Sequence, residues 1–199
     1  MISIIIPVYN EEECLGELFN RLLLLGSLFP DDIDCEFIFI NDGSTDNSLA
    51  ILKTQAVNNK KVKIISFSRN FGHQIAITAG LQHSIGDYVS IIDADLQDPP
   101  EIIPEFIKKA NEGFSIVYGI RNVRTESLLI RWQIKLFYKI WKNISDFDMP
   151  QNAGNFGIMS QEVVKTINSM TERNKFIRGL RAWIGYKSTG LTYQREKRK

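Results

Sequence analysis

The sequence predicts an α/β fold in which a mostly parallel β-sheet is flanked by helices. Three observations support this class. Short β-rich runs recur at similar intervals, longer helix-compatible segments separate them, and the runs are nearly continuous in Ile, Val and Phe rather than alternating with polar residues. Continuous apolar runs are typical of parallel strands that helices cover on both faces. The five expected strands are Ile2–Ile6, Glu36–Ile40, Val62–Phe67, Tyr88–Ile92 and Phe114–Tyr118.

Polar segments follow each of these runs. In an open parallel sheet, ligands bind beyond the carboxyl ends of the strands, so these segments are where a site is expected. They are Pro7–Glu12, Asn41–Asp46, Ser68–Gly72, Asp93–Pro100 and Gly119–Arg121.

The composition predicts one domain with two unlike halves. The 199 residues are 44% hydrophobic, which suffices for one substantial core. Residues 1–120 carry 8 Lys/Arg against 17 Asp/Glu, whereas residues 121–199 carry 16 against 6. An acidic half suits a cation and a neutral ligand, and a basic half suits phosphates, an anionic membrane or nucleic acid. Two solvated faces are the simpler alternative.

Cysteine content, hydropathy and absent motifs limit the cellular environment and the protein classes that the sequence fits. Cys14 and Cys35 have no metal-type spacing, and no signal peptide precedes the first apolar run, so we expect a reducing, cytosolic environment. No window reaches the ~18 apolar residues of a membrane-spanning helix. The sequence also lacks a Gly-Lys-Ser/Thr phosphate loop and a Gly-x-Gly-x-x-Gly turn, which argues against NTPases and dinucleotide enzymes.

The second half contains an amphipathic segment, Leu128–Lys142. Its periodicity predicts a helix with a basic face and an apolar, aromatic face, which is typical of helices that lie in a membrane interface. An ordinary helix that covers the core is the alternative. Nucleic acid is not an expected partner, because no reader motif is present and the aromatic rings share a helix with the apolar face. The basic face holds Arg131, Lys135, Lys139 and Lys142, and the apolar face holds Ile130, Ile134, Phe137 and Trp141.

The segment Asp93–Glu101, which reads Asp-Ala-Asp-Leu-Gln-Asp-Pro-Pro-Glu, carries the strongest chemical signal. Carboxylates one residue apart point to opposite sides of a strand unless the chain turns, and a turn here would aim Asp95 and Gln97 into one cleft. Oxygen ligands of this kind suit Mg²⁺ or Mn²⁺. As a structural alternative, Asp98 could cap the helix that Pro99 begins.

The segment Asn41–Asp46 follows the second expected strand. Gly43 can take a tight turn, and Asp46 can cap the helix that comes next. Asp42 is then left to face the cleft.

These segments, together with Arg69–His73, resemble the motif series of family 2 glycosyltransferases. More narrowly, they resemble the branch that transfers sugars from nucleoside diphosphates to polyprenyl or dolichyl phosphate. The resemblance implies a GT-A fold, a UDP- or GDP-linked sugar donor and a divalent cation, Mg²⁺ or Mn²⁺. It implies that Pro7, Tyr9, Glu11 and Asp42 hold the base and ribose, that Asn70 and Asn155 contact substrate, that Asp93 lies near the ribose or donor sugar, that Asp95 and Gln97 bind the metal, and that Arg121 lies near phosphate.

The segment Asn152–Ser160 bears on the acceptor. It occupies the place where many members of the resembled family carry an Asp directly before the Phe, yet it contains no carboxylate. Transfer to a sugar hydroxyl usually needs a general base, whereas a phosphate monoester with a second pKa of about 6 is already ionised. We therefore expect a lipid-phosphate acceptor. A saccharide hydroxyl acceptor and a catalytically silent nucleotide-sugar-binding scaffold are the alternatives.

The chain ends in a basic cluster. In the resembled branch an arginine pair here holds phosphates, and Arg195 and Arg198 are the matching positions. A solvated tail is the alternative. We expect residues 1–120 to bind donor and metal and residues 121–199 to face the acceptor. The resemblance implies work at the cytoplasmic side of a membrane, either peripherally or through helices beyond this chain, and it leaves a homo-oligomer open.

Overall fold

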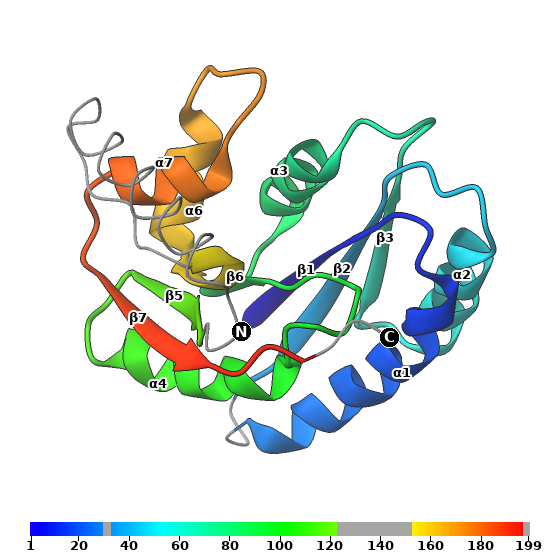
Figure 1. Cartoon of the computed structure of the whole chain (residues 1–199), viewed down its shortest axis with the longest axis horizontal. Helices are drawn as coiled ribbons and strands as arrows, with labels where there is room; N and C mark the ends of the chain where they lie inside the picture. The colour runs from blue at the N-terminus through cyan, green and yellow to red at the C-terminus, as the bar shows by residue number, and fades with distance from the viewer. Residues whose placement is uncertain (30–32, 123–152, 197–199) are drawn as a thin grey trace, which may run out of the picture.

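The computed structural model describes residues 1–29, 33–122 and 153–196. Within them a mixed sheet has the strand order β3-β2-β1-β4-β6-β5-β7 (Figure 1). The pairs β1–β2, β1–β4, β2–β3 and β5–β7 are parallel, and β6 runs antiparallel to both β4 and β5. The strands are β1 (Ile2–Val8), β2 (Cys35–Asn41), β3 (Val62–Ser66), β4 (Tyr88–Ile91), β5 (Ile116–Arg121), β6 (Ala153–Ser160) and β7 (Ser188–Tyr193).

Helices cover both faces of this sheet (Figure 1). The α-helices α1, α2 and α4 pack on one face, and α3, α6 and α7 pack on the other. Two 3₁₀ turns, η1 (Gly26–Leu28) and η2 (Pro100–Ile102), adjoin α1 and α4. The helices are α1 (Glu12–Leu25), α2 (Ser48–Asn58), α3 (His73–His83), α4 (Ile103–Asn111), α6 (Gln161–Ser169) and α7 (Ile177–Trp183).

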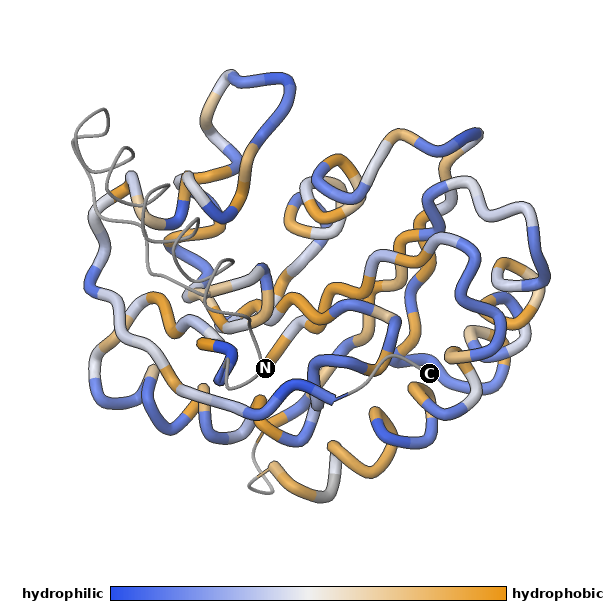
Figure 2. Tube along the Cα trace, viewed as in Figure 1, coloured by the Kyte–Doolittle hydropathy of each residue, from blue (hydrophilic) through white to orange (hydrophobic). Residues whose placement is uncertain are grey.

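The central strands are apolar on both sides, as the sequence predicts. In β1, Ile4 and Ile6 pack toward α1 and α4, whereas Ile5 packs toward α3. Every residue of β1 and β2 is buried. Figure 2 shows the same pattern as hydrophobic colouring along these strands between more polar outer segments. Burial on both faces explains why the runs do not alternate.

The predicted fold class is confirmed, with differences in the second half. The last expected strand begins at Ile116 rather than Phe114 and continues to Arg121. Strands β6 and β7 were not expected, and β6 makes the sheet mixed by entering antiparallel between β4 and β5. The expected basic helix Leu128–Lys142 lies outside the described residues. Across the described ranges, no helix combines the length and apolar character needed to cross a bilayer.

The register of the sheet decides where the site lies. Val8 at the end of β1 pairs with Asn41 at the end of β2, and Ile5 pairs with Ile91 at the end of β4. The loops that follow these three strands therefore leave the sheet at the same end, beyond the carboxyl ends of the strands.

Candidate active site

A cavity of about 450 Å³ lies at this end of the sheet. It collects side chains from the loops after β1, β2, β3 and β4, which are far apart in the sequence. Seven of the predicted site residues line it: Pro7, Tyr9, Glu11, Asp42, Asn70, Asp93 and Asp95. Val8, Gly72, His73 and Ala94 complete the lining.

The loops after β1 and β2 cap each other's helices. The carboxylate of Asp46 accepts hydrogen bonds from the backbone N–H of Ser48 at 2.9 Å and of Glu12 at 3.1 Å, which begin α2 and α1. In return, the Glu12 carboxylate accepts from the backbone N–H of Asn47 at 2.8 Å. Side-chain acceptors at helix starts satisfy donors that have no partner inside the helix. Asp46 thus accepts from the first amide of both helices as expected for a capping side chain, although the N-cap residue of α2 is Asn47.

Asp42 is buried at the cavity wall, where it orders the loop between β3 and α3. One carboxylate oxygen accepts from the backbone N–H of Phe71 at 2.7 Å, and the other accepts from that of Gly72 at 2.9 Å. Gly43 permits this close approach: it has φ +68°, and a Cβ there would lie 2.3 Å from the carbonyl carbon of Arg69. Because each carboxylate oxygen has two lone pairs, Asp42 keeps acceptor capacity for a ligand.

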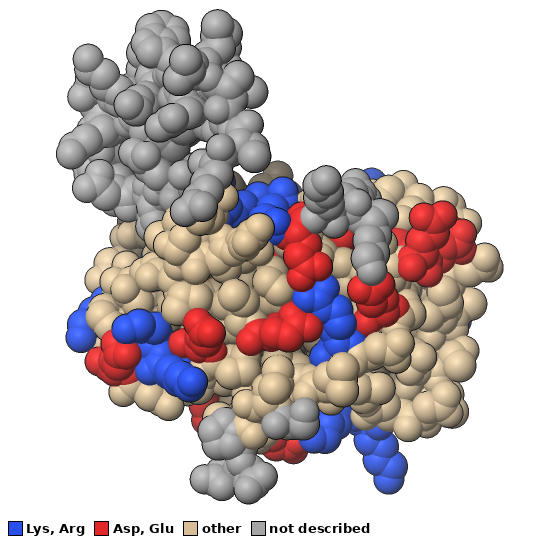
Figure 3. Space-filling view, turned by 60° about the horizontal axis from the view of Figure 1, so that its bottom comes forward, with Lys and Arg blue, Asp and Glu red and all other residues tan. Residues whose placement is uncertain are grey.

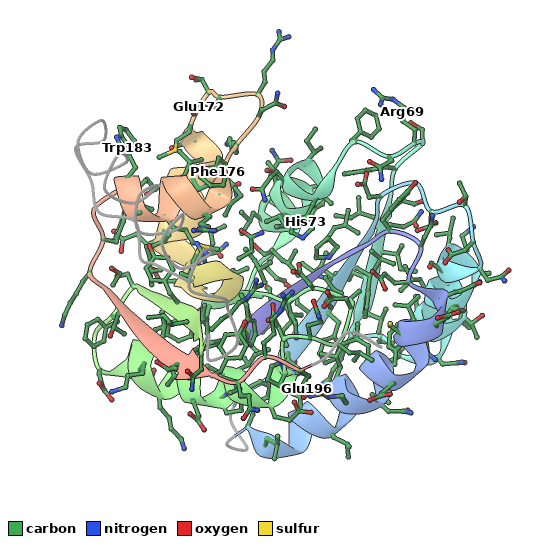
Figure 4. All side chains as sticks on the ribbon, viewed as in Figure 1. Arg69, His73, Glu172, Phe176, Trp183 and Glu196 are labelled. Carbon is green, nitrogen blue, oxygen red and sulfur yellow. The ribbon has the colours of Figure 1, made fainter. Side chains whose placement is uncertain are left out.

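His73 is a cavity residue that the sequence analysis did not select. It is the first residue of α3, shown beside β1 in Figure 4, and its Nε2 lies 2.8 Å from Oδ1 of Asp93. The hydrogen bond to Asp93 raises the pKa of His73, and the charges of Asp42 and Asp95 add to the rise. No local pattern links His73 to Asp93, because the two residues lie 20 positions apart in the sequence. The signal in the sequence that could have indicated a site role for His73 was its place in the segment Arg69–His73, directly after Gly72.

The loop after β4 makes the turn that the sequence analysis required. Leu96 has φ +59°, which is rare for a residue other than glycine. Asp93 and Asp95 consequently line the same cavity. Oδ1 of Asp95 accepts from the backbone N–H of Gln97 at 3.1 Å, and its Oδ2 lies 3.9 Å from Arg195. That separation is too long for a hydrogen bond, so Oδ2 can still bind a ligand.

This loop fits a divalent cation shared with a substrate. In the described ranges, no cluster of three or more His, Cys, Asp or Glu is arranged to hold a metal by itself. Mg²⁺ is commonly held by only one or two carboxylates, with water and substrate phosphates as its other ligands. Asp95 at the cavity meets that requirement, whereas Gln97 is not among the residues that line the cavity.

Asp98 does not cap the following helix, so the structural alternative for this residue is wrong. Its side chain is 1% exposed, and it accepts a hydrogen bond from the hydroxyl of Tyr193. Arg121 and Arg195 lie 3.6 Å and 3.7 Å from its carboxylate oxygens. Burial raises the pKa of Asp98. Contacts from β5 and β7, distant in the sequence, turn the side chain inward instead of toward the N-terminus of η2.

Comparison with known proteins agrees with this geometry. The sequence model of the family described as "Glycosyl transferase family 2" matches residues 3–167. The chain belongs to this family. Its fold is GT-A: the structure matches glucosyl-3-phosphoglycerate synthase from Mycobacterium tuberculosis, solved with Mn²⁺, UDP-glucose and phosphoglyceric acid, with a TM-score of 0.68. That likeness covers 100% of this chain and 72% of the synthase, at 18% identity.

Two relatives are more similar in sequence to this family 2 glycosyltransferase. An uncharacterised glycosyltransferase of Bacillus subtilis, YkcC, is 42% identical over 197 residues, which cover 98% of this chain and 60% of YkcC. A bactoprenol glucosyl transferase of Shigella phage SfX is 40% identical over 198 residues, which cover 99% of this chain and 64% of the phage protein. The chain thus spans 60% to 64% of the length of these relatives.

Other predicted residues of this family 2 glycosyltransferase lie away from the cavity lining. Arg121 donates from Nε to the hydroxyl of Tyr193 at 3.3 Å, beside Asp98. Asn155 lies on β6, and its side-chain oxygen is buried without a hydrogen-bond partner among the described residues. Its backbone carbonyl accepts from Arg181 at 3.1 Å, a fully buried arginine whose pKa burial lowers to about 10. Arg198 lies outside the described residues.

Proposed function

We propose that this glycosyltransferase moves a sugar from a nucleoside-diphosphate sugar to the phosphate of a polyprenyl-phosphate-type lipid, with inversion at the anomeric carbon. The observation that carries the proposal is the cavity, which gathers Asp93 and Asp95 with the residues that follow β1 and β2. The bactoprenol glucosyl transferase relative supports the choice of acceptor.

The donor nucleotide would occupy the part of the cavity formed by the first two loops. Pro7, Tyr9 and Glu11 offer an apolar ring, an aromatic face and a carboxylate for the base and ribose, and Asn70 lines the same cavity from the loop that Asp42 orders. Tyr9 is 45% exposed, so its ring is available for stacking. Asp93 would lie near the donor sugar. Either UDP or GDP could serve as the nucleotide.

Asp95 would hold Mg²⁺ or Mn²⁺, with Gln97 as the further ligand that the family resemblance implies. When bound, the cation supplies positive charge that stabilises the departing diphosphate. Two arginine side chains also approach this loop: Arg195 lies near Asp95 and Asp98, and Arg121 lies near Asp98. Guanidinium groups in that place suit the phosphate of the acceptor.

The chemistry needs no carboxylate base at β6. An oxygen of the lipid phosphate forms a bond to the anomeric carbon while the bond from that carbon to the β-phosphate oxygen of the donor breaks, and the nucleoside diphosphate leaves with the electron pair. The attacking phosphate is already ionised, so no proton has to be removed. Positioning and electrostatic stabilisation then provide the rate enhancement. An α-linked donor would give a β-linked product.

The proposal assigns residues 1–120 to donor and metal binding and residues 121–199 to the acceptor side, at the cytoplasmic face of a membrane. The experiment has two stages. Thermal unfolding with UDP, GDP and their sugars, each with and without Mn²⁺ or Mg²⁺, identifies the donor through its metal-dependent stabilisation. Transfer of labelled sugar is then measured to a polyprenyl phosphate, to the same polyprenol without phosphate, and to soluble saccharides.

We expect product only with the phosphorylated lipid, and NMR of that product should show a β linkage. Faster transfer to a saccharide would favour the hydroxyl-acceptor alternative. Tight donor binding without any transfer would favour the silent scaffold.

A further inference from the structure

The segment that follows β7 lies against the loop that carries Asp95. The backbone N–H of Glu196 donates to the carbonyl oxygen of Gln97 at 2.9 Å, and Arg195 approaches Asp95 and Asp98. Figure 1 shows the chain leaving β7 and running toward α1. We call residues 194–196 the strap.

Arg21 on α1 binds the strap through its last residue. Its guanidinium donates to both carboxylate oxygens of Glu196, at 2.9 Å and 3.3 Å, and to both carboxylate oxygens of Glu101, at 2.8 Å and 2.6 Å. Such two-pronged contacts fix direction as well as distance. Figure 3 shows acidic and basic side chains in alternation on this face of the molecule, which carries α1 and α4, and Figure 4 labels Glu196 at the end of the strap.

These contacts position Arg195, because the Arg195 side chain itself makes only long contacts. Its distances to Asp95 and Asp98 are 3.9 Å and 3.7 Å, both beyond hydrogen-bonding range. Its neighbours hold it instead. Before it, Tyr193 is fastened to Asp98, and after it, Glu196 is fastened to Gln97 and Arg21.

Without Arg21, Glu196 keeps its backbone hydrogen bond to Gln97 but loses both side-chain hydrogen bonds. Glu101 and Glu196 both contact the same guanidinium, so its removal leaves two carboxylates close together with like charge. Their repulsion would push the strap away from η2. The Arg21 side chain is 15% exposed, whereas the side chains of Glu101 and Glu196 are 43% and 46% exposed, so solvent screens part of this repulsion.

We propose that Arg21 is a positioning residue for the reaction: by anchoring Glu196 to α1 and η2, it holds Arg195 over the Asp95–Asp98 loop. Arg21 lies in no motif and does not line the cavity, so it touches neither the donor nor the reacting atoms. The consequence for transfer rests on the function proposed above, whereas the consequence for the strap does not.

The test combines a structural and a kinetic measurement on Arg21→Gln. Amide hydrogen exchange by NMR reports whether Glu196 remains bonded to Gln97, and kcat and KM for donor and lipid phosphate report the effect on transfer. Glu196→Gln weakens the same contact from the other side by removing its negative charge and one of its two acceptor oxygens, in case Arg21→Gln folds poorly. Lys109→Gln is the matched control, because it removes an exposed ion pair with Glu112 on α4, away from the strap.

We expect Arg21→Gln and Glu196→Gln to speed exchange of the Glu196 amide by about tenfold or more, with no change in Lys109→Gln. For transfer, we expect kcat/KM for the lipid phosphate to fall by about fivefold with an unchanged KM for the donor. In an Arg195→Gln background, Arg21→Gln should change kcat/KM by less than about twofold, because residues that act through one another are not additive.

Unchanged exchange at Glu196 would overturn the proposal. The proposal would also be overturned if the effects of Arg21→Gln and Arg195→Gln on kcat/KM multiply in the double variant, because Arg21 would then act independently of Arg195. If the unaltered protein transfers no sugar with any donor, the proposed function fails, and amide exchange alone decides whether Arg21 holds the strap.

Discussion

Tyr193, at the end of β7, donates the hydrogen of its phenol to the carboxylate of Asp98, which lies 95 residues earlier in the loop after β4. The same hydroxyl accepts from Nε of Arg121 at 3.3 Å, at the end of β5. Burial, followed by the Asp98 charge, raises the pKa of Tyr193 above its usual range, so the phenol stays a donor. Through this one side chain, the loop that carries Asp95 is fastened to the second half of the sheet.

Replacing Tyr193 by Phe tests this fastening. The change leaves the buried carboxylate of Asp98 without its hydrogen-bond donor, and we expect the free energy of unfolding to fall by about 1–3 kcal/mol. Urea denaturation measures the change. Tyr186→Phe is the control, because the Tyr186 hydroxyl contacts Thr166 and the exposed Glu162, where water can replace it. Equal losses of unfolding free energy in Tyr193→Phe and Tyr186→Phe would mean that the hydrogen bond to Asp98 contributes no more to stability than the exposed contacts of Tyr186.

Gly43→Ala tests the close approach of two loops at the cavity. A methyl group there would collide with the backbone of Arg69, and the backbone has a positive φ. We expect a loss of at least about 1–3 kcal/mol in unfolding free energy, together with weaker donor binding. In Gly16→Ala the new methyl group meets nothing within 4 Å on helix α1, so stability should hold or rise by up to about 1 kcal/mol. A similar result for both glycines would count against the close approach.

The contact between His73 and Asp93 predicts a pH dependence. The unfolded histidine has a pKa of about 6.5, and the folded pKa is raised by Asp93. Protonated His73 therefore adds its full stabilisation below pH ~6.5, and the contribution is lost as the pH rises through the folded pKa. The difference in Tm between the unaltered protein and His73→Gln should be largest near pH ~6 and shrink toward pH ~9. In an Asp93→Asn background this trend should weaken markedly, and a difference independent of pH would contradict the assignment.

Asp95→Asn tests the metal assignment. Neutralising this carboxylate should weaken the affinity for Mn²⁺ in the presence of UDP or GDP by at least about tenfold, measured by calorimetry. Asp87→Asn is the control, since Asp87 is 80% exposed and pairs only with the N-terminal amine in the described contacts. Unchanged affinity in Asp95→Asn would assign the metal to another group.

The sequence predicted the first half of the fold well, because its strands are buried on both faces and leave a continuous apolar signal. Strand β7 lies at the edge of the sheet, and its residues alternate between exposed and partly buried. Strand β6 contains Gly154 and Gly157 and few β-branched residues. Neither strand has the composition of a buried parallel strand, which is why the sequence did not reveal them.

For the site, local patterns located the loops but not the contacts between them. The motifs indicated that Asp42 and Asp95 would face one cleft, and both line the cavity; Gln97, which was expected beside Asp95, is not among the lining residues. The inward turn of Asp98 was missed because it depends on Tyr193 and Arg121, which no short-range pattern connects to it. The contact between His73 and Asp93 was missed for the same reason.

The strand order also imposes a sequence of events on synthesis. Strands β1 to β4 are adjacent in the order β3-β2-β1-β4, so the sheet beneath the loops after β1 and β2 can form once residue 91 has emerged from the ribosome. Strand β5 can join the sheet only later, because it pairs with β4 through β6, which emerges from the ribosome after it, and β7 then brings the Tyr193 hydroxyl that donates to Asp98. Because chains generally fold from the N-terminus as they are made, we expect the loops after β1 and β2 to form first and the loop of Asp95 and Asp98 to be fixed last. The loops after β1 and β2 and the loop of Asp95 and Asp98 are therefore completed at different times. Only a chain synthesised through Tyr193 contains both in their final form.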